Sequence, residues 1–301
     1  MSEQVLERIQ EVPKRDQRLY RQKAMAYFLR ILVWGSAAIT VGVLILLIGY
    51  ILVQGIPHLN ADLFAWEYNT DNVSMMPAII NTVVMTLMSL LVAVPIGVFS
   101  AIYLVEYARR GNKLVGIVRM TTETLSGIPS IVYGLFGYLM FGVAFGWGYS
   151  MMSGALTLAI MVLPSIMRTT EEALKAVPDS YREGSFGLGA GKLRTVFVII
   201  LPSAVPGILA GVILAIGRIT GETAALIYTA GTVAGIPTTK LSGVPVLDMM
   251  SSGRTLAIHM YALLNEGLYM EQAYATAVVL LVMVLLINAL SAFVAKKFTR
   301  S

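Results

Sequence analysis

Two charged residues of opposite sign stand inside a long apolar stretch of this chain. Arg218 and Glu222 lie four residues apart within residues 213–231, ILAIGRITGETAALIYTAG, and the hydroxyls of Thr220 and Thr223 accompany them. A continuous helix would place residues four apart on one face. The planar guanidinium of an arginine matches the oxygens of a tetrahedral oxyanion. The pattern predicts a group in the path of an oxyanion; the alternative is an ion pair that locks the helix to a neighbour.

The composition is that of a membrane protein. Apolar residues make up 57% of the 301 residues, charged residues only 13%, and the mean hydropathy is +0.76. A soluble domain carries roughly 25% charged residues. The chain has no cysteine, and its two histidines, His58 and His259, stand far apart and are expected in loops. Neither a disulfide nor a metal site is predicted.

Six apolar stretches are long enough to cross a bilayer, which takes roughly 20 helical residues. The first is expected to be a retained anchor, because it is long and no small-residue cleavage site follows it. The expected architecture is all-α, with six transmembrane helices over approximately Ile31–Val53, Pro77–Tyr107, Thr124–Phe145, Met151–Met167, Ala204–Ala230 and Gln272–Ala295. On this scheme Arg218 lies about 24 Å along the fifth helix from Pro202, well inside the bilayer.

The basic residues predict the orientation. Nineteen of the 22 lysines and arginines fall before residue 31, at 109–119, at 168–194 or after residue 295, all on one side of a six-span chain. The positive-inside rule puts that side and both termini in the cytoplasm. We expect a basic N-terminal segment 1–30, a first helix and outer loop 31–76, and a core of five helices 77–301 with a cytoplasmic loop at 168–201. Charges split among four short segments do not indicate nucleic-acid binding.

The cytoplasmic loop contains an unusual polar segment, YREGSFGLGAGKLRTVFVIILP, at 181–202. Ser180 and Glu183 form a capping-box pattern, so a short helix is expected to begin there and to end near Gly187 or Gly189. A second helical stretch, 192–200, is expected to lead into the fifth span. The arrangement predicts a rigid knob that docks into another protein; the simpler alternative is a capped helix in a solvated loop.

Two partial matches to catalytic motifs are incomplete. GAGK at 189–192 has Leu193 where a phosphate-binding loop has serine or threonine, and Phe186 where its first glycine belongs. A GxSxG motif is also absent. We expect no catalytic residue and no nucleotide site on this chain. Elsewhere, Glu123 is expected to be a charge at a cytoplasmic helix end, and Arg254–Leu264 an amphipathic helix near the outer surface.

The loop motif resembles a known family. The spacing EGS-x3-G-x9-I-x-LP over 183–202 is similar to the EAA loop of ABC importer permeases, with Gly184 and Ser185 in place of two alanines. The stretches SGIPSIVYGLFG (126–137), RTTEEALKAVPDSYREGSFGLGA (168–190) and ILAIGRITGETAALIYTAG resemble the PstA family of permeases in phosphate-specific ABC transporters. The resemblance runs from about residue 78 to the C-terminus. It implies that the ATPase is contacted by loop residues: Ser180, Arg182, Glu183, Gly184, Ser185, Gly189, Lys192, Leu201 and Pro202.

The resemblance also implies partners. The expected assembly pairs this chain with a homologous permease, PstC, above two copies of the ATPase PstB, and an external phosphate-binding protein, PstS, delivers inorganic phosphate. ATP and Mg²⁺ would bind to the ATPase, so no cofactor is expected on this chain. The expected location is the cytoplasmic (inner) membrane of a bacterium or archaeon, in contact with lipid. Two alternatives remain open: a permease of the same class for molybdate or sulfate, and an ATP-independent anion channel or carrier.

A hypothesis about selectivity follows for Glu222. Its carboxylate would partly neutralise Arg218 while the path is empty, and would accept a hydrogen bond from the acidic hydroxyl of phosphate. Fully ionised sulfate has no such proton and would be repelled.

Overall fold

The computed structural model describes residues 3–109, 111–241 and 244–299. The chain divides into two compact units, residues 1–53 and 54–301. Helix α1 (Glu3–Gly55) accounts for the first unit and continues through residue 30 without a break. The structure does not describe the side chains of several basic residues on which the predicted orientation depends. These are the basic residues up to Arg21, and Arg110, Lys297 and Arg300. The segment boundaries predicted at residues 30 and 76 stay predictions.

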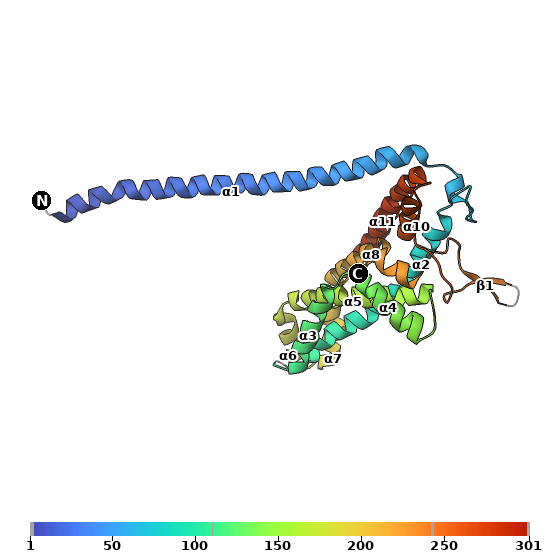
Figure 1. Cartoon of the computed structure of the whole chain (residues 1–301). Coiled ribbons are helices and arrows are strands. Elements are labelled where there is room, and N and C mark those ends of the chain that lie inside the picture. Colours follow the sequence, from blue (N-terminus) through green and yellow to red (C-terminus); the bar gives the residue numbers. More distant parts are fainter. Residues whose placement is uncertain (1–2, 110, 242–243, 300–301) are drawn as a thin grey trace. The chain divides into compact units, whose positions relative to one another are not determined.

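The second unit is built almost entirely from helices (Figure 1). Short 3₁₀ turns η1 (Ile56–His58) and η2 (Asp62–Phe64) precede its first long helix. The remaining elements are, in chain order, α2 (Met76–Ile102), the π-helical η3 (Tyr103–Tyr107), α3 (Lys113–Ser126), α4 (Ser130–Gly137), the π-helical η4 (Tyr138–Ala144), α5 (Met151–Ala176), α6 (Asp179–Gly187), α7 (Lys192–Thr195), the π-helical η5 (Val196–Ile200), α8 (Leu201–Thr220), α9 (Ala224–Thr229), β1 (Thr238–Leu241), β2 (Val244–Leu247), α10 (Leu256–Glu266) and α11 (Met270–Thr299).

Candidate membrane spans follow the hydropathy pattern. Within the described residues, five helical segments are long and apolar enough to cross a membrane, and a bent pair of helices raises the number to six. The five are Gln22–His58, Met76–Tyr107, Met151–Ala176, Lys192–Thr220 and Met270–Phe293. The sixth, Lys113–Ser126 with Ser130–Ala144, is bent by 105°.

The third predicted span is therefore not one straight helix. The prediction of a single helix over 124–145 is wrong, because α3 ends at Ser126 and α4 starts at Ser130. Pro129 occupies the N-cap position of α4 with an extended backbone, ψ 142°. Proline has no N–H to continue the helix of α3, and it turns the residue before it away from the helical conformation.

The fifth predicted span also breaks. Its start agrees with the prediction of a helical lead-in over 192–200, where α7 passes through η5 into α8. The π-helical stretch lies just before Pro202, whose missing N–H interrupts the normal hydrogen-bond ladder. A single helix over 204–230 is wrong, however, since α8 ends at Thr220 with Gly221 as its C-cap and α9 begins at Ala224.

The core of the second unit lies where α5 packs between α2 and α8. Met85, Leu158 and Ala215 are among its buried side chains. Small residues bring α5 and α8 close together: a Cβ on Gly207 would lie 2.6 Å from the Cβ of Ala173. The two helices therefore approach too closely at this point for a larger residue at position 207.

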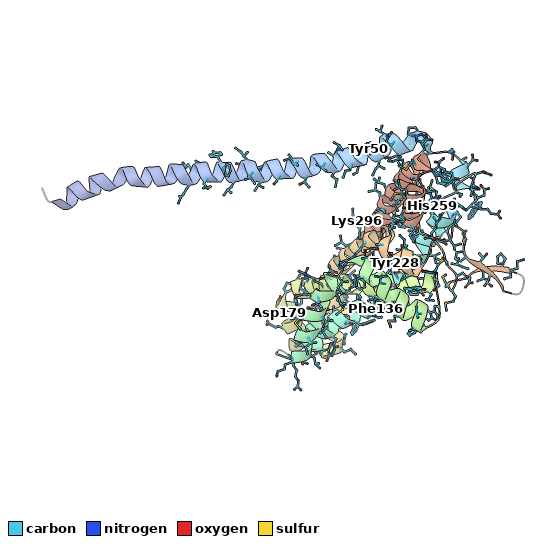
Figure 2. All side chains as sticks on the ribbon, viewed as in Figure 1. Tyr50, Phe136, Asp179, Tyr228, His259 and Lys296 are labelled. Atoms are coloured by element: carbon cyan, nitrogen blue, oxygen red, sulfur yellow. The ribbon has the colours of Figure 1, made fainter. Side chains whose placement is uncertain are left out.

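The loop between α9 and α11 folds back onto the helices. Strands β1 and β2 form an antiparallel pair in which Thr238 faces Leu247. Thr82 Oγ1 of α2 accepts the N–H of Leu256 at 2.8 Å, which holds the start of α10. The predicted helix over 254–264 is present as α10, and it has a buried face and an exposed one, as an amphipathic helix has. Its place near the outer surface stays a prediction. His259, expected in a loop, lies in α10 (Figure 2). Its side chain is on the buried face, with 0% exposure.

Candidate functional site

Two regions of the second unit contain the residues that the sequence singles out. The 179–195 segment, made of α6 and α7, lies with α3 towards one end of the unit, and α10 lies towards the other (Figure 1). The second region surrounds Arg218 and the breaks after α3 and α8.

The 179–195 segment is a helix, a tight turn and a second helix. α6 ends at Gly187, as predicted, and Gly189 in the turn has a left-handed backbone with φ +80°. Glycine takes this conformation without the strain that a side chain adds. The predicted capping box at Ser180 and Glu183 is wrong, because α6 starts at Asp179 and Pro178 is its N-cap, without a side-chain cap bond.

The predicted contact residues divide into an outward and an inward group. Ser185 is buried, and its hydroxyl lies 2.8 Å from the hydroxyl of Thr195, which joins α6 to α7. Leu201 and Arg182 are partly buried. The outward group is exposed: Ser180, Glu183, Gly184, Gly189, Lys192 and Pro202.

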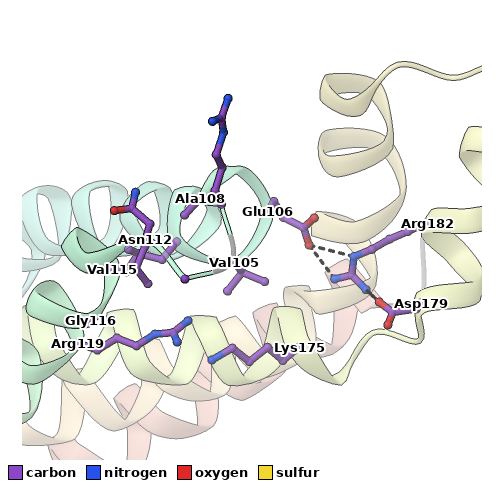
Figure 3. Close-up of a pocket in the computed structure, with 13 residues that line it drawn as sticks. Val105, Glu106, Ala108, Asn112, Val115, Gly116, Arg119, Lys175, Asp179 and Arg182 are labelled. Carbon is purple, nitrogen blue, oxygen red and sulfur yellow. Dashed lines mark hydrogen bonds and ion pairs between the residues drawn. The ribbon is translucent and has the colours of Figure 1, made fainter.

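Arg182 points away from the outward group and back into its own chain. Its guanidinium bonds to Glu106 in η3, which follows α2, beside a cavity of about 660 Å³ (Figure 3). The hydrogen bond with Glu106 raises the pKa of Arg182 above its usual value. Sequence reasoning missed Glu106, because nothing local marks a partner 76 positions earlier in the chain.

The two broken spans meet each other. Within the first of them, the hydroxyl of Tyr133 in α4 donates to the carbonyl of Leu125 in α3 at 2.8 Å. α4 also packs closely on α9, with Gly134 against Ala225. Non-helical backbone at membrane depth is tolerated where it is buried in protein or lines a polar cavity.

Arg218 lines such a cavity. The space has a volume of about 380 Å³ and lies between α3, α5 and α8. α3 ends at the first break, and its residues Glu123 and Ser126 line the cavity together with Arg168 of α5. Glu123, expected as a cytoplasmic helix-end charge, thus lies near the end of α3 and faces the same space as Arg218.

The other three residues predicted for the path lie elsewhere. Arg218 and Glu222 do not share a helical face, because α8 ends between them at Thr220. Glu222 Oε1 instead accepts the backbone N–H of Ala225 at 3.1 Å and so stabilises the start of α9. Thr220 is buried, and its hydroxyl donates to the carbonyl of Ile216 at 3.0 Å. The hydroxyl of Thr223 has a long contact, 3.5 Å, with the carbonyl of Gly221.

Ion pairs on the cavity wall involve residues other than Arg218. Glu171 Oε2 pairs with Arg119 at 3.1 Å and with Lys175 at 2.9 Å. Arg168 pairs with Glu172 at 3.1 Å. Among the residues that the structure describes, no carboxylate lies within ion-pair distance of Arg218. The i,i+4 spacing of the pairs on α5 was visible in the sequence, whereas the partner on α3 was not.

Comparison with known proteins defines the class. Residues 93–300 match the family described as binding-protein-dependent transport system inner membrane component. The chain belongs to this family of membrane permeases, and the predicted all-α permease fold is confirmed. Its membrane-spanning, multi-pass character is consistent with the candidate spans.

Individual relatives include permeases of phosphate transport systems. The chain is 34% identical over 270 residues to the probable ABC transporter permease protein YqgI of Bacillus subtilis, covering 84% of this chain and 88% of that protein. It is 37% identical over 235 residues to the phosphate transport system permease protein PstA 2 of Mycobacterium bovis, covering 78% and 77%. It is 38% identical over 182 residues to the phosphate transport system permease protein PstA of Pasteurella multocida, covering 60% and 64%.

Solved structures share the fold at low identity. A bacterial alginate ABC transporter in complex with its periplasmic protein superposes with a TM-score of 0.63 at 16% identity, covering 98% of this chain and 99% of that one. The MetNI methionine ABC transporter gives 0.56 at 20% identity, covering 75% and 94%.

Proposed function

We propose that this chain is the permease subunit of an ATP-driven importer that moves inorganic phosphate into the cytoplasm. The assignment of phosphate as the substrate rests on the similarity to PstA 2 over more than three quarters of both chains. The proposed partners are a homologous permease, two copies of an ATPase that binds ATP and Mg²⁺, and an external phosphate-binding protein. Both termini are proposed to be cytoplasmic.

Arg218 is the residue proposed to meet the anion. Its guanidinium lines the cavity between α3, α5 and α8 without an ion-pair partner among the described residues. An arginine within a span is costly unless it faces protein or water, so such residues mark functional paths. The guanidinium fork can bind two oxygens of a tetrahedral anion at once.

The breaks after α3 and α8 supply a reason for a gate at this position. Ser126 and Arg218 line one cavity, and α4 and α9 beyond the two breaks are packed together. A shift of that packed pair relative to α3 and α8 would alter the cavity without unfolding a helix. We place the narrow point of the path there.

The 179–195 segment is proposed as the docking element for the ATPase. Five residues of the outward group, Ser180, Glu183, Gly184, Gly189 and Lys192, lie in this segment, and Leu188 beside Gly189 is 91% exposed. A permease without an ATP site needs a rigid surface element through which ATP-driven motion enters the chain. The helix, turn and helix joined by Ser185 and Thr195 meet that need.

Reconstitution tests the proposal. Proteoliposomes containing this chain, the second permease and the ATPase, with the binding protein outside, should accumulate radioactive phosphate only when ATP is inside. Excess sulfate or molybdate should compete weakly. If either anion competes strongly, that anion and not phosphate would be the substrate. Uptake by this chain alone without ATP would show that it is a channel or carrier and not part of an importer.

A further inference from the structure

We propose that Arg182 is a positioning residue that ties α6 to the cytoplasmic end of α2 through Glu106, so that α6 moves together with α2 and α5. The inference rests on the proposed function, because it concerns how motion of the docking element reaches the membrane helices. It differs from the sequence-based expectation, in which Arg182 contacts the ATPase directly.

The geometry is that of a multi-point clamp (Figure 3). Nε and Nη2 of Arg182 both donate to Oε1 of Glu106, at 3.2 and 2.7 Å. Nη1 donates to the carbonyl of Val177 at 2.9 Å and to Oδ1 of Asp179 at 3.0 Å. Nη2 also donates to the carbonyl of Leu174 at 3.0 Å. One guanidinium therefore connects α6 with the ends of both α2 and α5.

The two ends reached by Arg182 favour a cation. Leu174 and Val177 stand at the C-terminal end of α5, where carbonyls lack partners in the helix and the helix dipole is negative. Glu106 lies in η3, the π-helical end of the α2 span. Hydrogen bonds between charged groups are stronger and shorter than neutral ones, which suits the 2.7 Å contact.

Burial separates this pair from the surface ion pairs. The side chains of Arg182 and Glu106 are 16% and 8% exposed. Breaking a buried pair leaves one charge without compensation, which costs far more than breaking a surface pair. An ion pair at this depth is therefore able to hold two helices in a fixed relation.

A cavity lies next to the pair. Glu106 and Arg182 line the space of about 660 Å³ together with Val115 and Gly116 of α3 and Lys175 of α5. Side-chain packing does not fill this space, so the hydrogen bonds of Arg182 supply the connection between α6 and the α2 end there. A rigid link across a cavity transmits displacement while leaving α3 free to adjust.

The first experiment measures coupling in the reconstituted complex. Glu106→Gln and Arg182→Gln should each lower phosphate uptake per ATP hydrolysed by about tenfold, in line with the loss of charge-assisted hydrogen bonds. The double variant should be no worse than the poorer single variant, because both remove the same interaction. Arg182→Lys should recover part of the loss. Unchanged uptake per ATP in Glu106→Gln, or additive losses in the double variant, would overturn the proposal.

The second experiment needs no partner protein. The chain contains no cysteine, so Leu188→Cys offers a single site for a nitroxide label on the exposed turn. In the purified full chain, Glu106→Gln should increase the mobility of that label, and unchanged mobility would refute the clamp. If the clamp is found but the complex transports nothing with ATP, the proposed function fails while the structural inference stands.

Two control variants separate the clamp from a general loss of charge. Glu271→Gln removes the carboxylate of a surface pair with His58, in which Glu271 is 69% exposed, and should change neither measurement. The exchange Arg182→Glu with Glu106→Arg should not restore coupling, because a carboxylate at 182 cannot donate to the carbonyls of Leu174 and Val177. Full recovery of coupling by the exchange would contradict the clamp, because an ion pair alone would then be sufficient.

Discussion

Gly134 of α4 lies directly against Ala225 of α9, so that a Cβ on Gly134 would stand 2.8 Å from both the Cα and the carbonyl oxygen of Ala225. The neighbouring atoms are backbone, which cannot move aside as a flexible side chain would. The contact joins the helices that follow the breaks in the third and fifth predicted spans. It leaves no room for a side chain between α4 and α9 at this point.

A side chain at Gly134 should therefore block transport. Gly134→Val forces α4 away from α9, and overpacking of this kind costs about 1–3 kcal/mol. We expect phosphate uptake to fall to background while the protein still reaches the membrane. Gly42→Val, in α1 with open space around the glycine, should retain uptake. Normal uptake by Gly134→Val would show that the two breaks move independently.

The turn at Gly189 should be needed for coupling to the ATPase. Leucine there must adopt φ near +80°, which costs roughly 1–2 kcal/mol and places bulk on the docking surface. We expect Gly189→Leu to hydrolyse ATP with little uptake. Gly267→Leu carries a similar backbone strain at φ +71°, far from the 179–195 segment and from the Arg182 clamp, and should remain coupled. Equal behaviour of the two variants would assign the effect to strain alone.

Removal of the cation at 218 should stop uptake. Arg218→Ala removes the guanidinium from the cavity wall, and Arg218→Lys keeps the charge but loses the two-point fork. We expect uptake below about a tenth of wild type for the alanine variant and an intermediate value for lysine. Arg30→Ala on α1 serves as the matched control. Near-normal uptake by Arg218→Ala would leave this arginine a structural role only.

The selectivity hypothesis for Glu222 has a separate test. Glu222→Gln keeps an oxygen that can accept the N–H of Ala225, so the start of α9 should remain formed. If the carboxylate accepts the proton of phosphate, this variant should admit sulfate more readily in competition assays. Unchanged sulfate competition in an active variant would leave Glu222 as a helix-capping residue, which is how the structure places it.

Orientation in the membrane can be measured by thiol labelling, since no native cysteine competes. Single cysteines at Asn69 and Val244 should react with an impermeant reagent added outside. Cysteines at Asn112, Lys175 and Ser301 should react only after the membrane is opened. Labelling of Asn69 from the cytoplasm would contradict the six-span arrangement and would favour a bent pair, α3 and α4, that does not cross.

Acid should destabilise the fold around α10 through His259. Burial and the nearby Arg254 lower the pKa of His259 to about 3. The unfolded chain therefore binds a proton near pH 6.5 that the folded chain rejects. The contribution of this group is complete above pH 6.5 and is lost as the pH falls, by about 1.4 kcal/mol per unit. Unfolding of the purified protein should show this slope between pH 6.5 and 4, and His259→Phe should flatten it, whereas His58→Gln should not.

Much of the architecture was readable from local sequence order. Runs of apolar residues gave the candidate spans, because a bilayer demands about 20 such residues in a row. The end of α6 at Gly187 and the left-handed Gly189 also followed from neighbouring residues, since helix ends depend on the conformational preferences of a few positions.

The contacts that define the site were decided by the tertiary structure. Glu106 meets Arg182 across 76 positions, and Gly134 meets Ala225, because folded helices bring distant turns side by side. The break after Thr220, which separates Arg218 from Glu222, lies where the apolar stretch predicted a continuous helix. Hydropathy reports how much of a segment avoids water, whereas the partner of a buried charge depends on which helices pack together, and no local spacing records that choice.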